Sequence, residues 1–163
     1  MTNLRRAMAS DEPFLREMLA AAADWRTPVA GRSGDEVMRD PNVAHYLAGW
    51  PRHGDFGVIA DENGVSVGAA WCRSFDSEPH GYGFVAPDVP ELTIGVVTEK
   101  RGRGIGRLVL GEILREAQHR GIERISLSVE ADNPAIGLYT DVGFVEQFRV
   151  ADSPTMVIDC GAT

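Results

Sequence analysis

The residues from Arg101 to Gly106 read Arg-Gly-Arg-Gly-Ile-Gly, a spacing of arginine and glycine suited to binding phosphate. They follow an apolar run, Leu92 to Val97, and precede a fifteen-residue amphipathic stretch, Ile105 to His119. A strand that passes through a glycine turn into a helix leaves the first helical amides unpaired, and the helix dipole favours negative charge there. Glycines also let a phosphate approach the backbone closely. Positive charge is supplied nearby by Lys100, Arg101, Arg103 and Arg107. The sequence therefore predicts a site for a phosphate-bearing ligand.

Two other phosphate-binding turns fit this segment less well. A Walker loop requires a lysine followed by a hydroxyl residue after its last glycine, and no such pair occurs here. A dinucleotide turn requires Gly-x-Gly-x-x-Gly, but the last position is Arg107 when counted from Gly102 and Val109 when counted from Gly104. Glu130 lies where a ribose-binding acid would stand, so the dinucleotide interpretation stays open. A turn that only redirects the chain is the other alternative.

Two segments resemble the signatures of the GNAT-type N-acetyltransferase family. The first signature, Arg/Gln-x-x-Gly-x-Gly/Ala after an apolar strand, is filled by Arg101, Gly104 and Gly106. The second, Ala-x-x-Leu-Tyr-x-x-x-Gly-Phe, is filled by Ala135, Leu138, Tyr139, Gly143 and Phe144. The two motifs occur in the family's order and at its separation, between Glu91 and Phe144. Their joint occurrence is far more specific than either motif alone.

The resemblance implies an α/β (α+β) fold in a single N-acetyltransferase domain over residues 1–163. It implies a mixed, mostly antiparallel sheet of six to seven strands with about four flanking helices. Two parallel middle strands, Leu92 to Val97 and Arg124 to Val129, are expected to splay apart around a pantetheine arm. The implied activity is transfer of an acetyl group from acetyl-CoA to a primary amine by direct attack. The alternative from another class is a non-catalytic sensor of acetyl-CoA or another acyl-CoA.

The resemblance also assigns residues to the coenzyme. Amides near Ile94 and Val96 are expected to pair with the pantetheine and the thioester carbonyl. The diphosphate is expected to bind at Arg101, Gly102, Arg103, Gly104, Ile105, Gly106 and Arg107. Asn133 is a further candidate, although it stands two residues before Ala135 where the common form has three. A helix cap before Pro134 is the other interpretation of Asn133, and both can hold together.

Two residues are candidates for the proton transfers that the reaction needs. Tyr139 matches the family tyrosine, and a phenol with an unperturbed pKa of about 10 can protonate the departing thiolate. Glu91 begins the strand beside the expected thioester and is the candidate base, directly or through a water. The alternatives are a Tyr139 ring that fills the core and a Glu91 carboxylate that is merely solvated.

The acceptor is expected to be a small-molecule amine or an amine of a protein or peptide. Five aromatic residues fall in or beside the loops that wall the acceptor side in this family: Trp25, Trp50, Trp71, Tyr82 and Phe84. Three acids lie close by in the sequence: Asp76, Glu78 and Asp88. This mixture suits a cationic amine with an apolar body, and ordinary core and surface positions are the alternative.

Composition favours one compact domain, because 163 residues with 44% hydrophobic content can bury a sizeable core. The net charge of −8 argues against nucleic-acid binding. Cys72, Cys160 and four dispersed histidines predict neither a metal site nor a disulfide framework. The sequence has no apolar signal region behind Met1 to Met8 and no run of eighteen apolar residues, which predicts a cytoplasmic protein without membrane contact. Family members are often dimers, so the resemblance leaves a homodimer open.

Periodicity predicts the elements that must position these residues. Strands are expected at Leu4–Met8, Phe56–Ala60, Val65–Phe75, Leu92–Val97, Arg124–Val129, Phe144–Val150 and Thr155–Ile158. Helices are expected after a Ser10 cap, at Asp35–Met38, Pro41–Gly49, Ile105–His119 and Pro134–Asp141. Gly111 lies inside one helix, where glycine costs about 1 kcal/mol relative to alanine, and close packing is one explanation for it.

Overall fold

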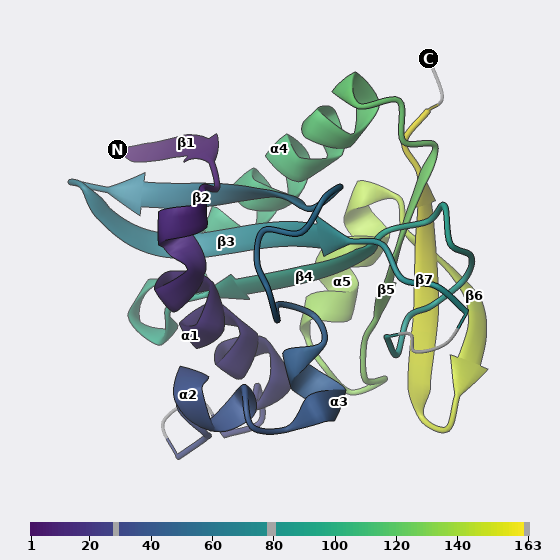
Figure 1. Ribbon diagram of the computed structural model, residues 1–163, viewed down its shortest axis with the longest axis horizontal. Helices are drawn as coiled ribbons and strands as arrows, with labels where there is room; N and C mark the ends of the chain where they lie inside the picture. Colours follow the sequence, from purple (N-terminus) through teal and green to yellow (C-terminus); the bar gives the residue numbers. More distant parts are fainter. Residues whose placement is uncertain (28–29, 78–80, 162–163) are drawn as a thin grey trace. The chain divides into compact units, whose positions relative to one another are not determined.

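The computed structural model describes residues 1–27, 30–77 and 81–161. The strands are β1 (Thr2–Arg6), β2 (Phe56–Glu62), β3 (Val65–Arg73), β4 (Glu91–Val96), β5 (Arg124–Ser128), β6 (Val145–Val150) and β7 (Ser153–Asp159). The α-helices are α1 (Glu12–Ala23), α2 (Gly34–Val37), α3 (Pro41–Ala44), α4 (Ile105–His119) and α5 (Ala135–Val142). Two 3-10 helices, η1 (Ala9–Asp11) and η2 (Thr98–Lys100), precede α1 and α4. Figure 1 shows these elements along the chain.

The seven strands form one sheet in the order β1-β2-β3-β4-β5-β7-β6. β4 and β5 are parallel, with Glu91 paired to Ser126, as expected for strands joined through a helix. The pairs β1–β2, β2–β3, β5–β7 and β6–β7 are antiparallel. The predicted mixed sheet with a parallel middle pair is therefore confirmed. The splaying of that pair stays a prediction.

The chain divides into two compact units. The first unit comprises Met1–Arg73 with Thr93–Ile113, and the second comprises Ser74–Leu92 with Leu114–Thr163. Each unit carries part of the candidate chemistry. The single domain expected from the sequence stays a prediction.

In the first unit, β2 and β3 form the predicted hairpin around Asn63 and Gly64. Both turn residues have positive φ, 53° and 77°, which is the backbone of the tight turns that match strand twist. The hairpin packs on α1 through a buried apolar cluster that includes Leu15, Leu19 and Trp71. The local turn sequence and the apolar strands together explain why this part of the fold follows from the sequence.

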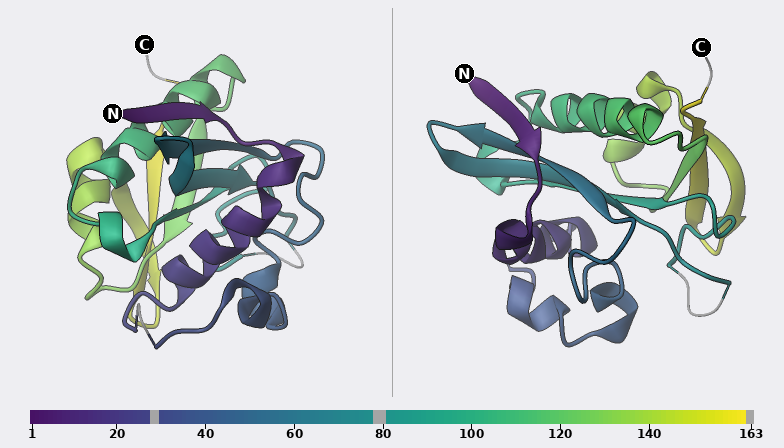
Figure 2. Two further views of the ribbon diagram at one scale, coloured as in Figure 1. Left: turned by 90° about the vertical axis from the view of Figure 1, so that its left-hand side faces the viewer. Right: turned by 45° about the horizontal axis from the view of Figure 1, so that its top comes forward.

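Two glycines bring helices close to the strands of the first unit. A Cβ on Gly95 of β4 would stand 2.7 Å from the Met18 carbonyl oxygen of α1. A Cβ on Gly68 of β3 would stand 2.8 Å from Cγ2 of Ile105, the first residue of α4. Figure 2 shows α1 and the start of α4 on opposite faces of the β2–β3 hairpin. Glycine at position 68 therefore leaves room for the first residue of α4 against β3.

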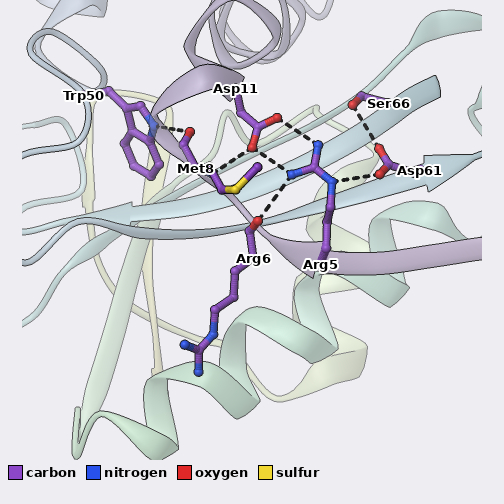
Figure 3. A network of polar contacts seen from close by, with 7 residues as sticks. All are labelled: Arg5, Arg6, Met8, Asp11, Trp50, Asp61 and Ser66. Atoms are coloured by element: carbon purple, nitrogen blue, oxygen red, sulfur yellow. Dashed lines mark hydrogen bonds and ion pairs between the residues drawn. The ribbon is translucent and has the colours of Figure 1, made fainter. Parts of the chain in front are cut away.

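A polar network joins β1, η1 and β2 in the first unit (Figure 3). The Arg5 guanidinium donates to both carboxylate oxygens of Asp11 at 2.8 Å and, through Nε, to Asp61 at 2.8 Å. Asp11 also accepts from the Met8 amide at 2.7 Å, and its hydrogen bond with Arg5 lowers its pKa. The predicted Ser10 cap is wrong, because η1 intervenes and Asp11 is the N-cap residue of α1. Asp11 serves the network rather than the helix.

A second polar anchor ends β3. The Arg73 side chain is 1% exposed and pairs with Asp55 at 2.7 Å. Its remaining donors reach the carbonyl oxygens of His45, Leu47 and Ala48. A buried guanidinium is tolerated when its charge is paired and its N–H groups are bonded. Arg73 thus ties the segment after α3 to the sheet.

In the second unit, β5, β7 and β6 are joined by antiparallel pairing. One face of β5 and β7 is apolar, with Ile125, Leu127 and Met156 buried. A Cβ on Gly143, the C-cap residue of α5, would stand 3.5 Å from Ile158 Cδ1 of β7. The other face carries Ser126, which is also fully buried. Both faces of β5 are therefore buried.

Gly111 of α4 does not mark close packing. Apart from its chain neighbours and the backbone of its own helix, no heavy atom of the described residues lies within 4 Å of the position that a Cβ would take, and Gly111 lacks a positive φ. Its helical position therefore has room for alanine.

Candidate functional site

The arginine and glycine turn lies where the sequence places it, directly before α4. Gly102 and Gly104 have φ values of 77° and 85°, a region that favours glycine. A Cβ on either residue would meet no atom within 4 Å. Glycine is thus required here by backbone conformation, and the space beside the turn is open.

The start of α4 leaves backbone donors available. The Gly104 carbonyl oxygen accepts from the Leu108 amide at 3.1 Å, the first bond of the helix. Within the described residues the amides of Ile105 and Gly106 have no acceptor, and the first turn contains no acidic side chain. These two N–H groups and the positive end of the helix dipole are what an anion requires.

The basic residues around the turn differ in their engagement. Arg101, Arg103 and Arg107 are exposed, and Arg101 Nε donates to the Val96 carbonyl oxygen at 3.3 Å. Lys100 instead pairs with Glu62 of β2 at 3.1 Å. The sequence analysis predicted that Lys100 adds positive charge at the turn. The Glu62 carboxylate partly neutralises the charge of Lys100, so Arg101 and Arg103 contribute more of the positive charge at the turn.

The backbone of β4 has the alternation expected for coenzyme binding. The Val97 amide donates to the Val67 carbonyl oxygen of β3 at 2.9 Å. Because successive amides of a strand point to opposite edges, those of Val96 and Ile94 are directed away from β3. Both residues are half-buried. Their N–H groups therefore lie on the strand edge where the sequence places the pantetheine.

Glu91 is not the solvated carboxylate of the alternative interpretation. It is 2% exposed, and its Oε1 and Oε2 accept from the amides of Gly83 at 2.8 Å and Gly81 at 3.2 Å. A Cβ on Gly81 would overlap this carboxylate, so only glycine lets the chain lie so close. Sequence reasoning did not assign Gly81 or Gly83 to the site, and the only local signal for them is that they flank Tyr82 as Gly-Tyr-Gly. A buried, amide-bound carboxylate is the result.

Tyr139 lies on α5, as its motif implies. It is 7% exposed, and its ring contacts Phe144 edge-on with centroids 5.8 Å apart. Burial raises the pKa of the Tyr139 hydroxyl above its ordinary value. The phenol therefore keeps its proton at neutral pH, as an acid must before it acts.

Asn133 lies just before α5. Its Oδ1 accepts from the Ala135 amide at 2.9 Å, and its carbonyl oxygen accepts from the Ile136 amide at 3.1 Å. Pro134 rather than Asn133 is the N-cap residue of α5, which begins at Ala135, so Asn133 stands one residue before the predicted place and supplies an acceptor to the first helical amide from there. A contact of Asn133 with the coenzyme stays a prediction.

The residues expected on the acceptor side fall into different environments. Trp50 and Trp71 belong to the core of the first unit, where their indole N–H groups donate to the carbonyl oxygens of Met8 and Tyr46. Tyr82 is 59% exposed, and Asp76 and Asp88 are exposed. Trp25 and Phe84 are half-buried. Glu78 lies outside the described residues.

Two absences concern the described part of the chain. No helix there is both long and apolar enough to cross a membrane. Across the same residues, no three histidine, cysteine or acidic side chains gather in a way that could hold a metal ion.

Comparison with known proteins gives matches over most of the chain. The profile of the "Acetyltransferase (GNAT) family" matches residues 16–144. The L-amino acid N-acyltransferase MnaT of Escherichia coli (strain K12) is 32% identical over 143 residues, covering 82% of this chain and 71% of that protein. The mycothiol acetyltransferase of Amycolatopsis mediterranei (strain U-32) is 30% identical over 136 residues, covering 82% of this chain. This chain spans only 42% of the length of that relative.

Solved structures share the fold. The crystal structure of an N-acetyltransferase from Staphylococcus aureus Mu50 matches with a TM-score of 0.72 at 21% identity. The match covers 98% of this chain and 99% of that one. The fold inferred from two short motifs is therefore found over the whole length of a solved relative.

Proposed function

The chain belongs to the GNAT acetyltransferase family, and on that premise we propose that it moves an acetyl group from acetyl-CoA to a primary amine. The observation that carries the proposal is the start of α4. Two glycines there have positive φ, and the space beside them is open. The amides of Ile105 and Gly106 have no hydrogen-bond acceptor among the described residues, so the turn can bind an anion. A diphosphate is the part of coenzyme A that such a site would bind.

The coenzyme would be held mostly by backbone. Amides of the turn and the first helical residues would bind the diphosphate, with Arg101, Arg103 and Arg107 adding charge. The amides of Ile94 and Val96 would pair with the pantetheine as an added strand does. The Asn133 side-chain N–H groups would be available for a further contact, because its hydrogen bond with the Ala135 amide uses only Oδ1.

The reaction needs three proton transfers. The acceptor ammonium first loses a proton, which Glu91 takes. The neutral nitrogen then attacks the thioester carbon, so that a C–N bond forms and the C–S bond breaks. Tyr139 protonates the departing thiolate and recovers a proton that the acylated nitrogen loses. In the balanced reaction an ammonium and acetyl-CoA give an amide, free coenzyme A and one released proton.

The acceptor class is proposed from chemistry and from the relatives. Exposed Asp76 and Asp88 would attract a cationic amine, while Tyr82 offers an apolar surface. The names of two relatives refer to L-amino acids and to mycothiol. A small amine is therefore the first acceptor to test, and a peptide amine is the second. A cytoplasmic location belongs to the same proposal.

One observation favours a second candidate, a sensor that binds acyl-CoA without transferring the group. Glu91 is 2% exposed and already accepts two amide hydrogen bonds. A carboxylate so enclosed could be purely structural. The two candidates share the coenzyme site and differ in whether an acceptor is consumed.

The test measures thiol release from acetyl-CoA across a panel of amino acids, polyamines and peptide amines, alongside calorimetry with acetyl-CoA. We expect coenzyme binding and thiol release that depends on the amine. Binding of acetyl-CoA without amine-dependent thiol release would support the sensor and contradict the transferase. Absence of binding would overturn both candidates.

A further inference from the structure

The strand at one edge of the sheet, β6, is exposed along its whole length. It pairs with β7 alone, so its outer edge has no strand partner among the residues that the structure describes. Figure 1 shows β6 lying along β7. All six residues of the strand, Val145 to Val150, are exposed. An uncovered edge of this kind is a template on which another strand can pair.

A shift of register in β6 gathers its apolar side chains on one face. The shift lies at Gln147, which the pairing with β7 skips. Three apolar residues pair with alternate residues of β7: Val145 with Val157, Phe148 with Thr155 and Val150 with Ser153. Alternate residues of a strand share a face, and so do paired residues. The three side chains are 64%, 44% and 59% exposed in chain order, and we call them the apolar row of β6.

The two charged side chains of β6 lie on the opposite face. Glu146 pairs with Met156 and Arg149 with Pro154, which are also alternate residues of β7. Glu146 and Arg149 therefore have the same orientation in the strand, because Gln147 is skipped between them. The Arg149 guanidinium donates to the Glu146 carboxylate at 2.7 and 3.2 Å. β6 is thus electrically neutral in a chain of net charge −8, so its own charges do not repel a second copy.

The side chains of β6 are complementary to those of the same strand run in reverse. When two β6 strands pair antiparallel about Phe148, Glu146 of each copy lies opposite Arg149 of the other. Val145 of each copy then lies opposite Val150 of the other, and the two Phe148 side chains meet at the axis. Opposite residues in an antiparallel ladder must have the same orientation, and each of these pairs does. A two-fold axis requires such self-complementarity.

The strand at the other edge of the sheet, β1, lacks this complementarity. It carries Arg5 and Arg6 and no acidic residue. Two β1 strands side by side would bring together only positive charges, and charged side chains are a common means by which edge strands avoid pairing. The large apolar residue of β1, Leu4, is half-buried. The two edges of the sheet therefore differ in their capacity for self-association.

We propose that β6 is an interface at which two copies of this chain pair as antiparallel strands about a two-fold axis at Phe148. The pairing joins the apolar rows of the two copies on one face. On the other face it makes two ion pairs, each between Glu146 of one copy and Arg149 of the other. A six-residue strand edge is at the small end of specific interfaces, so the dimer dissociates on dilution. The inference does not depend on the proposed acetyl transfer.

Charge reversal tests this pairing, with sedimentation velocity from micromolar to near-millimolar protein as the measurement. The wild type should change from monomer to dimer as its concentration rises. Glu146→Arg and Arg149→Glu each place like charges opposite one another, so each should raise the dissociation constant of the dimer about tenfold or more. An equimolar mixture of the two variants should dimerise again, because the two arginines of one variant then lie opposite the two glutamates of the other.

The matched control reverses the charges of an exposed ion pair outside β6, between Glu116 and Arg120 of α4. Glu116→Arg and Arg120→Glu should leave the dissociation constant at the wild-type value, alone and mixed. A wild type that stays monomeric at every concentration would overturn the proposal. A dimer that survives both reversals in β6 would also overturn it, as would two monomeric β6 variants whose mixture stays monomeric.

Phe148→Cys gives a second measurement that does not depend on charge. Paired residues have Cβ atoms about 4.5–5.5 Å apart, close to the separation in a disulfide, so mild oxidation should link two copies through this residue. Val65→Cys, at a residue that is 64% exposed in β3, is the control and should not link. The native Cys72 and Cys160 are buried. A Phe148→Cys protein that sediments as a dimer and forms no disulfide would overturn the proposed register.

Discussion

The start of α4 in the first unit and the Glu91 environment in the second unit solve opposite problems with the same groups. At the start of α4, backbone amides are left without acceptors beside open space. Around Glu91, backbone amides are already committed to a buried carboxylate. The first arrangement leaves amides free to receive an anion from outside, and in the second the acceptor is a side chain of the protein itself. Binding of the coenzyme and removal of the proton therefore depend on separable features.

The largest effect is expected at Glu91. Glu91→Gln should lower kcat/KM about 100-fold or more, because a general base contributes 10²–10⁴. Its affinity for acetyl-CoA, measured by calorimetry, should stay near that of the wild type. If Glu91→Gln were as active as the wild type, the carboxylate would have only a structural role, and the two regions would not differ in function as described above.

Glu91→Ala tests whether the carboxylate also stabilises the fold. It leaves the Gly81 and Gly83 amides without their acceptor, which should lower the free energy of unfolding by about 3 kcal/mol. Denaturant unfolding measures this, with Glu91→Gln as the matched control because one oxygen still accepts. A loss no larger than that of Glu91→Gln would contradict the two amide bonds.

Tyr139→Phe should reduce turnover about tenfold to a hundredfold, because the thiolate would leave without a proton donor. Affinity for acetyl-CoA should hold, since the ring and its contact with Phe144 are kept. Steady-state kinetics and calorimetry separate the two quantities. Unchanged turnover would remove the phenol from the mechanism.

The start of α4 is tested by Gly104→Val. A β-branched residue resists φ of +85°, so the turn should distort and affinity for acetyl-CoA should fall about tenfold, or about 1.4 kcal/mol. Gly111→Ala in the same helix is the matched control. It should leave affinity unchanged and raise the free energy of unfolding by up to about 1 kcal/mol. Loss of affinity in both variants would mean that the helix as a whole, rather than the turn, determines binding.

The smallest expected effect is a loss of folding stability at alkaline pH, caused by the buried Cys160 thiol of the second unit. Burial, with a contribution from Asp159, raises the pKa of the Cys160 thiol to about 11. Above pH 9 the unfolded chain loses this proton while the folded chain keeps it, so stability should fall between pH 9 and 11. Tyr139 adds a slope of the same sign, and the difference between wild type and Cys160→Ala isolates the thiol. Parallel pH curves for the two proteins would contradict a raised pKa.

The start of α4 could be predicted from the sequence because it consists of glycine and backbone. The bounds Ile105–His119 and the positive φ of Gly104 follow from local residue types. The surroundings of Glu91 could not, because the Gly81 and Gly83 amides and the buried Ser126 come from segments brought together by packing. Ser10 failed as a cap for a similar reason, since Asp11 is drawn into a network with Arg5 from another strand. A feature made by neighbouring residues can be predicted from one sequence. The burial of a polar side chain cannot, because it depends on residues that are distant in the sequence.

The central claim is that the first amides of α4 bind the diphosphate of coenzyme A. The most direct measurement is the change of the amide resonances of Ile105 and Gly106 in nitrogen–proton correlation spectra as coenzyme A is added. We expect both resonances to move with one saturating dissociation constant while that of Gly111 stays in place. Saturable binding that leaves the Ile105 and Gly106 resonances unmoved would contradict the account.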